Sequence, residues 1–239
     1  MKKTLASQPT AVIARLRAMA SADYAAHMAH FGIAGSERLG ISIPALRAVA
    51  RDTGRSHDLA VALWASGIHE ARILACMLED PEHITSKQLD AWVRDIDSWD
   101  LCDGFADLVA ASPHAYAKVR AWAPRRDEFV RRAAFATIAW LAVHDKAAED
   151  DAFVALLPLI REASTDDRNF VKKAVNWALR QVGKRNMTLH AAAIAEAEAI
   201  RALDSRSARW IAADALRELR SEATIARTEA RTARQAARS

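Results

Sequence analysis

The feature that most constrains the fold of this chain is a repeated helical segment. "FVRRAAFATIAWL" begins at Phe129 and "FVKKAVNWALRQV" begins at Phe170, and both open with Phe-Val, two basic residues and Ala. Weaker copies with similar apolar and charged residues are "IHEARILACML" from Ile68, "SWDLCDGFADLV" from Ser98 and "RWIAADALRELR" from Arg209. Helix-pair repeats of the HEAT or armadillo type recur at about 40–47 residues, and shorter members are common. The repetition therefore predicts stacked helix pairs.

The composition agrees with a chain built from helices alone. Only 7 Gly and 6 Pro interrupt 239 residues, Ala, Leu, Arg and Glu dominate, and alternating strand-like runs are nearly absent. A hydrophobic fraction of 51% is enough for a continuous core. Because one helix pair cannot bury its apolar face alone, we expect an all-α, right-handed superhelical solenoid of HEAT-like helix-pair repeats with a concave basic surface.

The domain organisation predicted from the sequence is simple. No Gly- or Ser-rich linker divides the chain, so residues 1–220 are predicted to form a single repeat domain. The segment 221–239, "SEATIARTEARTARQAARS", is basic and poor in apolar residues. It is predicted to be a frayed helix or a disordered tail.

Several classes of protein are disfavoured by the sequence. Cys76 and Cys102 have no metal-ligand spacing, the eight His residues form no H-E-x-x-H pattern, and there is no P-loop or G-x-G-x-x-G. The N-terminus lacks a signal-peptide apolar region, and no apolar run approaches the roughly 20 residues of a membrane span. We therefore expect a reduced, cytoplasmic protein that uses neither a metal nor an organic cofactor and has no membrane partner.

The segment "DSWDLCD" places three carboxylates around an indole, although like charges at helical spacing repel each other. Asp97 or Ser98 as a helix cap and Asp100 in the first turn would be explained by helix initiation. Asp103 lies beyond the first turn and shares a helix face with Trp99, one turn earlier. Asp103 is therefore the candidate for a chemical role.

A second candidate region is strongly basic. The segment from 168 to 185 has six cations and no acid, although the net charge of the whole chain is only +4. Surface helices usually interleave charges of both signs, so this segment predicts a phosphate-binding face that also includes the basic pair one repeat earlier. The predicted DNA-binding residues are Arg131, Arg168, Lys172, Lys173, Arg180, Lys184 and Arg185. Trp177 by itself is more typical of a core residue.

The segments "DSWDLCD", "FVRRAAFA", "DRNFVKKAVNWALRQVGKRN" and "ARWIAADALREL", in this order and spacing, resemble the DNA alkylation repair glycosylases built from HEAT-like repeats (the AlkD type). The resemblance implies a catalytic set of Trp99, Asp103, Arg132 and Trp177, with Arg180 and Lys184 on the DNA backbone. It implies hydrolysis of the N-glycosidic bond of N3- or N7-alkylated purines without a cofactor. It also implies that the lesion is captured along a concave surface without a tight base pocket.

One position departs from the family pattern, which has a further Trp where this chain has Ser98, so the stacking surface is expected to be smaller. The expected partner is double-stranded DNA containing alkylated purines, bound by a monomer in the cytoplasm, in association with the nucleoid. Two alternatives stay open at this point. They are a HEAT-like protein that binds DNA structures without catalysis, and a protein-interaction scaffold.

Overall fold

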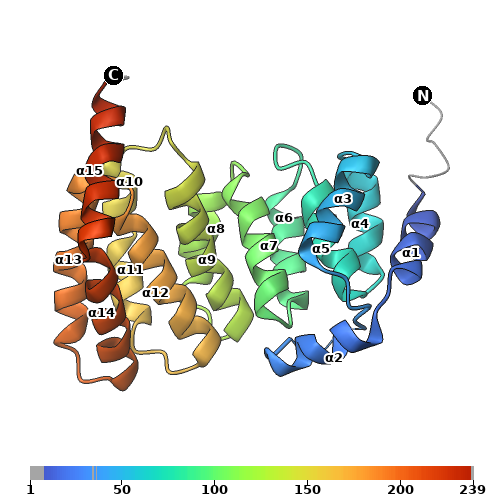
Figure 1. The fold of residues 1–239 in the computed structure, drawn as a ribbon, viewed down its shortest axis with the longest axis horizontal. Helices are drawn as coiled ribbons and strands as arrows, with labels where there is room; N and C mark the ends of the chain where they lie inside the picture. The colour runs from blue at the N-terminus through green and yellow to red at the C-terminus, as the bar shows by residue number, and fades with distance from the viewer. Residues whose placement is uncertain (1–7, 34, 36, 238–239) are drawn as a thin grey trace. The chain divides into compact units, whose positions relative to one another are not determined.

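The computed structural model describes residues 8–33, 35 and 37–237, and within that part of the chain every regular element is helical (Figure 1). The residues fall into two compact units, Met1–Pro113 and His114–Ser239. The boundary lies in the short turn at Ser112 and Pro113, and the single domain predicted over 1–220 stays a prediction. This turn contains the same kinds of residue as the other turns between helices, so the composition of the sequence does not mark it as a boundary between units.

The first unit packs its helices around buried aromatic rings. Its elements are α1 (Pro9–Ala18), α2 (Ala22–His30), α3 (Ile43–Thr53), α4 (His57–Ala65), α5 (His69–Leu78), α6 (Ser86–Trp92), the 3-10 helix η2 (Val93–Asp95) and α7 (Trp99–Ala110). Helix α5 contacts α3, α4 and α7. The rings of Trp64 and Trp92 stack at 4.2 Å, and Phe105 of α7 lies 6.0 Å from Trp64. These rings join α4, α6 and α7 in one core.

The second unit consists of helix pairs, a short helix between the first and second pairs, and one further helix after the last pair. Its elements are α8 (Ala115–Trp122), α9 (Glu128–His144), α10 (Asp150–Val154), α11 (Leu157–Ala163), α12 (Asn169–Gly183), α13 (Met187–Arg201), α14 (Arg206–Leu219) and α15 (Glu222–Ala236). Helix α12 lies between α9 and α14, while α8, α11 and α13 pack against α9, α12 and α14 respectively. Buried Ala133, Ala174 and Ala178 on α9 and α12 allow close packing of these helices. The rings of Phe129 and Phe170 lie 5.6 Å apart, so equivalent positions of the two strongest repeats contact each other.

Helix starts follow the sequence signals closely. At seven helices of the described chain the side chain of the N-cap residue accepts a hydrogen bond from the backbone N–H three residues later, which satisfies a donor that has no partner within the helix. These caps are Ser21, Ser42, Ser56, Thr85, Asn186, Ser205 and Ser221.

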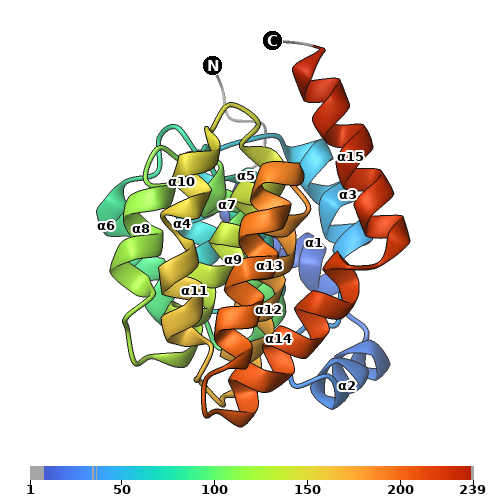
Figure 2. The same cartoon turned by 90° about the vertical axis from the view of Figure 1, so that its left-hand side faces the viewer.

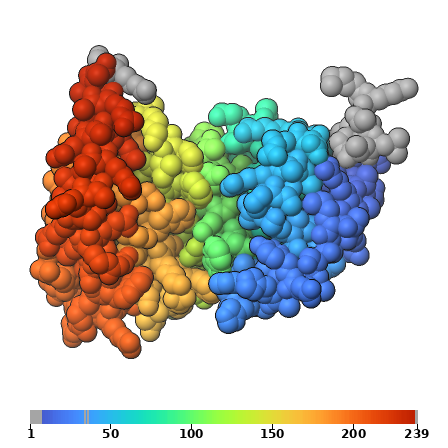
Figure 3. Space-filling model, viewed as in Figure 1, coloured from blue at the N-terminus to red at the C-terminus, as the bar shows by residue number. Residues whose placement is uncertain are grey.

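Within the predicted tail 221–239, Glu222–Ala236 form the helix α15, which contacts α13 and α14 along the outside of the second unit (Figures 2 and 3). Thr224 and Thr228 are buried, and Thr232 Oγ1 accepts a hydrogen bond of 3.0 Å from the backbone N–H of Met187. Threonines at i, i+4 and i+8 form the inward face of α15. Because threonine is polar, an interpretation based on apolar residues overlooks this stripe.

Candidate functional site

Trp99 and Asp103 lie on α7, at its first and fifth residues, so they share a face as predicted. Both side chains are partly exposed. The indole Nε1 of Trp99 donates a hydrogen bond of 3.1 Å to the backbone carbonyl of Phe31, just after α2. The only polar group of the indole, the N–H at its edge, is thus used to hold the ring in place. The aromatic face of the indole makes no part of this hydrogen bond and can pack against a ligand.

The residues before Trp99 have structural roles. Ser98 is the N-cap of α7 and is fully buried, so this position offers no surface to a ligand. Asp97 lies against Gly35, where an added Cβ would come 2.3 Å from the carboxylate Oδ2. Gly35 also has a φ of +120°, a conformation that favours glycine. Asp97 therefore packs the segment between α2 and α3 against the start of α7.

Asp100 is in the first turn of α7, as expected for an acid that favours the helix dipole, and it also has a specific partner. Its Oδ2 lies 2.8 Å from Nε2 of His69, whose side chain is 1% exposed. Burial by itself would raise the pKa of Asp100, but the hydrogen bond and charge of His69 outweigh it and the pKa lies below its ordinary value. Asp100 is therefore held as a carboxylate.

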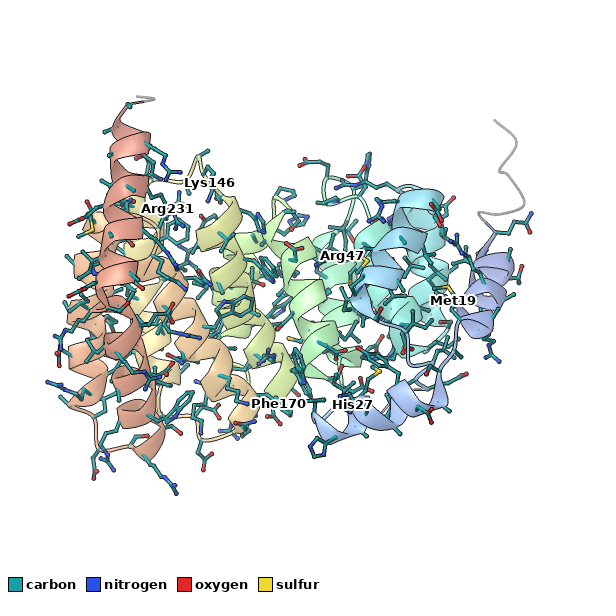
Figure 4. All side chains as sticks on the ribbon, viewed as in Figure 1. Met19, His27, Arg47, Lys146, Phe170 and Arg231 are labelled. Atoms are coloured by element: carbon teal, nitrogen blue, oxygen red, sulfur yellow. The ribbon has the colours of Figure 1, made fainter. Side chains whose placement is uncertain are left out.

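A cavity of about 320 Å³ lies beside Trp99 within the first unit. Its lining is mostly apolar and aromatic and includes Tyr24, Phe31, Ile41, Ile73, Trp99 and Asp100. His27, which projects from α2, also lines it (Figure 4). The residues of α2 that line this cavity have no signal in the sequence, because α2 is far from "DSWDLCD" in the chain.

One wall of this cavity is fixed by a buried acid. The fully buried carboxylate of Glu70 accepts hydrogen bonds from the backbone N–H groups of Leu39 at 2.8 Å, Gly40 at 2.7 Å and Ile41 at 3.3 Å. Three donors on one carboxylate hold this irregular segment against α5. The adjacent pair His69 and Glu70, which has no metal-binding pattern in the sequence, thus organises the cavity. Among the described residues, no cluster of three or more His, Cys, Asp or Glu side chains is suited to a metal ion.

The other two residues of the predicted catalytic set lie in the second unit. Arg132 on α9 is 5% exposed, and its Nη1 donates a hydrogen bond of 2.7 Å to the backbone carbonyl of Phe170 at the start of α12. Trp177 on α12 is partly exposed and meets the ring of Trp140 edge to face, with ring centroids 5.5 Å apart. Trp140 in turn stacks on His144 at 5.2 Å. Trp177 therefore belongs to an aromatic cluster on α9 and α12.

The basic segment finds its counter-charges outside itself. Arg180 and Lys184 both pair with Glu218 of α14, and Lys184 Nζ lies 2.7 Å from Glu218 Oε1. Burial would raise the pKa of Glu218, but Lys184 and Arg180 lower it below its ordinary value. Asn176, on the same helix, donates to Asp214 of α14. The absence of acids within the segment thus does not mean an absence of ion pairs.

The remaining predicted phosphate ligands differ in accessibility. Arg131 and Arg168 both pair with Asp166, at 2.9 Å and 2.6 Å, and the pKa of Asp166 lies below its ordinary value, because Arg168 and Arg131 outweigh the effect of burial. Lys172 Nζ lies 5.0 Å from the centroid of the Trp210 ring, which is 41% exposed. Lys173 is exposed, and in the described part of the chain it has no ion-pair partner.

Arg185 does not have the exposure expected of a phosphate ligand. It is 3% exposed, lies 4.4 Å from the centroid of the Phe153 ring and donates from Nη2 to the carbonyl of Ala148. Its placement argues against the predicted contact with DNA. The guanidinium instead holds the segment after α9 against the end of α12, because the chain folds back there and covers it.

Comparison with known proteins identifies a family and solved structures with a similar fold. The model of the DNA alkylation repair enzyme family matches residues 12–234. The chain belongs to this family. A solved structure that is similar is described as "a new family of proteins related to the HEAT-like repeat DNA glycosylases with affinity for branched DNA structures". It is 19% identical, with a TM-score of 0.73 over 87% of this chain and 94% of that chain. A comparison with curated proteins found no match.

The family assignment confirms the resemblance seen in the sequence, and the structural match confirms an all-helical fold related to the HEAT-like repeat glycosylases. The right-handed superhelix and its concave basic surface stay predictions. No helix in the described residues is both long and apolar enough to cross a membrane.

The structure of this DNA alkylation repair family member also reveals cations that the sequence analysis did not assign. On α15, Arg227, Arg231 and Arg234 are exposed and lie at i, i+4 and i+7, so they share one face. Arg231 donates to the carbonyl of Lys184 at the end of α12 and lies near Lys146 (Figure 4). Burial, Arg231 and Arg185 together lower the pKa of Lys146. The i, i+4, i+7 spacing is the signal that could have identified this face.

Proposed function

We propose that this protein is a DNA glycosylase that hydrolyses the N-glycosidic bond of N3- or N7-alkylated purines in duplex DNA and leaves an abasic site. The observation that carries the proposal is the pairing on α7 of an anchored indole, Trp99, with a carboxylate one turn later, Asp103, in a chain of the DNA alkylation repair enzyme family. An anion beside an aromatic face suits a reaction in which positive charge develops on a sugar.

The chemistry of the substrate sets what the protein must supply. Alkylation at N3 or N7 makes the purine cationic, so it leaves as a neutral base when the C1′–N bond breaks and the bonding electrons move to the ring. The deoxyribose then acquires oxocarbenium character. In this proposal the carboxylate of Asp103 stabilises that charge, orients a water towards C1′ and accepts its proton as the new C–O bond forms.

The aromatic and basic residues bind and position the nucleotide in the same proposal. Trp99 packs against the deoxyribose and attracts the cationic lesion through its electron-rich face, and Trp177 offers a further aromatic face to the DNA. Lys172, Lys173 and the pair Arg180 and Lys184 contact phosphates and fix the register without reading sequence. Arg132, which is buried, orders the start of α12 through its hydrogen bond to Phe170, and its positive charge favours binding of the DNA backbone.

The test is release of 7-methylguanine or 3-methyladenine from methylated duplex DNA. We expect wild-type protein to release base and produce abasic sites, and Asp103→Asn to reduce the single-turnover rate about 100-fold or more. Asp107→Asn is the matched control, because Asp107 is an exposed acid one turn further along α7. If base release persists unchanged in Asp103→Asn, the assigned role of Asp103 is wrong.

A second function is favoured by one specific observation, the affinity for branched DNA attributed to the similar structure. A non-catalytic protein of this kind would bind branched DNA more tightly than linear duplex and produce no abasic site. Gel-shift titrations with a four-way junction and a matched duplex, run beside the excision assay, separate the two functions. Binding to the junction with no base release from methylated duplex would replace the glycosylase proposal.

A further inference from the structure

Three cations, which we call the cation cluster, gather near the C-terminal ends of α9 and α12. Lys146 follows α9 and donates to a backbone carbonyl in the last turn of that helix, while Arg231 of α15 donates to the carbonyl of Lys184 at the end of α12. The side chains of Lys146 and Arg231 lie near each other (Figure 4). Arg185, the third member, is buried and donates to the carbonyl of Ala148 at 2.7 Å. The fold thus brings together positive charges from three separate segments of the second unit.

The surroundings of the cation cluster do not neutralise it. A helix C-terminus carries roughly half a negative charge, so the two helix ends offset about one of the three positive charges. Asp145, the neighbouring acid, accepts hydrogen bonds from the hydroxyl of Tyr116 at 2.9 Å and from a backbone N–H at 3.0 Å. In the described part of the chain, no acid forms an ion pair with any member of the cluster. Even with Asp145 counted against a second charge, about one positive charge is left over.

The buried member of the cluster adds a charge that the protein leaves without a counter-ion. Nε and Nη1 of Arg185 are buried, and they have no hydrogen-bond partner among the described residues. Its contact with the ring of Phe153 offsets only part of the cost of burying a charge. Burial and the charges of Arg231 and Arg185 also lower the pKa of Lys146. An anion at the exposed side of the cluster would relieve the repulsion among these groups, because charges interact strongly near a low-dielectric interior.

Helix α15 continues the positive surface on both sides of Arg231. Arg227 and Arg234 are exposed on the same face, whereas Glu229, two residues before Arg231, points to the opposite side of the helix. In the part of the chain that the structure describes, neither Arg227 nor Arg234 has an ion-pair partner. The row from Arg227 to Arg234 is about 10 Å long along the helix axis. Each strand of duplex DNA carries a phosphate about every 3.4 Å along its axis, so the row spans about three phosphates.

We propose that the cation cluster and the exposed arginines of α15 form an accessory surface that binds backbone phosphates of duplex DNA beyond those held by α12. The contact of Arg231 with the end of α12 makes this surface continuous with the cations predicted on that helix. The exposed members contact phosphates, whereas Arg185 stays buried and touches no ligand. The surface lengthens the bound stretch of DNA without reading its sequence. The proposal rests on the DNA binding of the proposed function and not on base release.

The first experiment measures the accessibility of Lys146 in the unaltered protein. Lysines are acetylated with a water-soluble ester and the extent of reaction is read by mass spectrometry. We expect bound, unmodified duplex DNA to slow acetylation of Lys146 several-fold and to leave Lys87, an exposed lysine of α6, unchanged. Inorganic phosphate at the same concentration of phosphate groups should protect neither lysine.

Two results of this experiment would overturn the proposal. Equal protection of Lys146 by inorganic phosphate would assign the cation cluster to a small free anion rather than to DNA. Undiminished acetylation of Lys146 in the DNA complex would mean that the backbone does not reach the cluster.

Variants test the contribution of α15 to DNA binding. Arg231→Met should reduce the slope of log K against log salt by about 0.9, whereas Arg231→Lys keeps the charge and should keep the slope. Arg201→Met is the control, because it removes an exposed cation at the far end of α13, about 21 Å along that helix from its start beside α15. Arg227→Met, whose side chain is exposed, covers the case in which loss of Arg231 loosens α15. Unchanged slopes in both Met variants of α15 would refute the accessory surface.

These measurements separate the accessory surface from the glycosylase reaction, because they use unmodified DNA. Protection of Lys146 by DNA in a protein that releases no methylated base keeps the surface and contradicts the glycosylase. Base release by a protein whose Lys146 is not protected contradicts the accessory surface alone.

Discussion

His69 Nε2 and Asp100 Oδ2 lie 2.8 Å apart, joining the first residue of α5 to the first turn of α7. Any short acid at this position would favour helix initiation, but the buried imidazole makes the requirement for Asp100 specific. The pair fixes the start of α7, and with it the direction in which Trp99 enters the helix.

Acidification should weaken this link. Since the pKa of Asp100 is lower in the folded state than its ordinary value of 3.8, its contribution to stability is present above that value and is lost as pH falls through the folded pKa. Asp100→Asn should cost about 2 kcal/mol at neutral pH and show a shallower loss of stability in acid. Urea unfolding followed by circular dichroism at several pH values measures both. Parallel pH dependences for the two proteins would show that Asp100 is not the linked group.

Two substitutions at Trp99 should separate anchoring from packing. Trp99→Phe keeps an aromatic face but loses the donor to Phe31, so we expect about 1 kcal/mol less stability and most of the base release retained. Trp99→Ala should lose most of the base release. The comparison uses urea unfolding and single-turnover excision. Equal activity of the two variants would exclude a role for the aromatic face.

Removing the shared counter-charge should strengthen DNA binding. Glu218→Gln removes the counter-charge of Lys184 and one of the two of Arg180, which also lies 3.8 Å from Asp214, so we expect tighter binding to duplex DNA and a steeper dependence of log K on log salt. The slope should steepen by about 0.9 for each additional phosphate that the protein neutralises. Fluorescence anisotropy over a salt series measures the slope. Glu222→Gln, an exposed acid in the first turn of α15, is the control for the change in net charge. An unchanged slope in Glu218→Gln would remove these two cations from the interface.

The sequence predicts DNA contacts for both Lys173 and Arg185, but their surroundings in the structure give opposite expectations. Lys173→Met should reduce the salt slope by about 0.9 without affecting stability, because the side chain is exposed. Arg185→Ala should lower the free energy of unfolding by about 2 kcal/mol through loss of packing on Phe153, with the slope unchanged. A reduced salt slope in Arg185→Ala would reinstate Arg185 as a phosphate ligand.

Docking of α15 depends on its threonine face. Thr232→Val leaves the Met187 N–H without the hydroxyl that accepts from it, so we expect a loss of about 1–2 kcal/mol and faster hydrogen exchange along α15. Thr188→Val, at an exposed position of α13, provides the control. Unaltered exchange in Thr232→Val would mean that α15 is held by other contacts.

The candidate site was predictable where it depends on local spacing. The repeats, the helix over "SWDLCDGFADLV" and the shared face of Trp99 and Asp103 follow from a period of 3.6 residues. The counter-charges of Arg180 and Lys184 were not predictable in this way, since Glu218 belongs to another helix. The burial of Arg185 was unpredictable for the same reason, because a charge pattern within one segment does not show which side chains the chain later covers.

The sequence by itself determined that this chain is an array of helices of the DNA alkylation repair type, because helical periodicity and the family motifs reside in short stretches. Only the tertiary structure decided the partners of the key side chains. His69 and Asp100 are 31 residues apart, Lys184 and Glu218 are 34 apart, and Trp99 and Phe31 are 68 apart. Such contacts depend on how the helices pack, and that packing minimises the free energy of the whole unit rather than of any one segment.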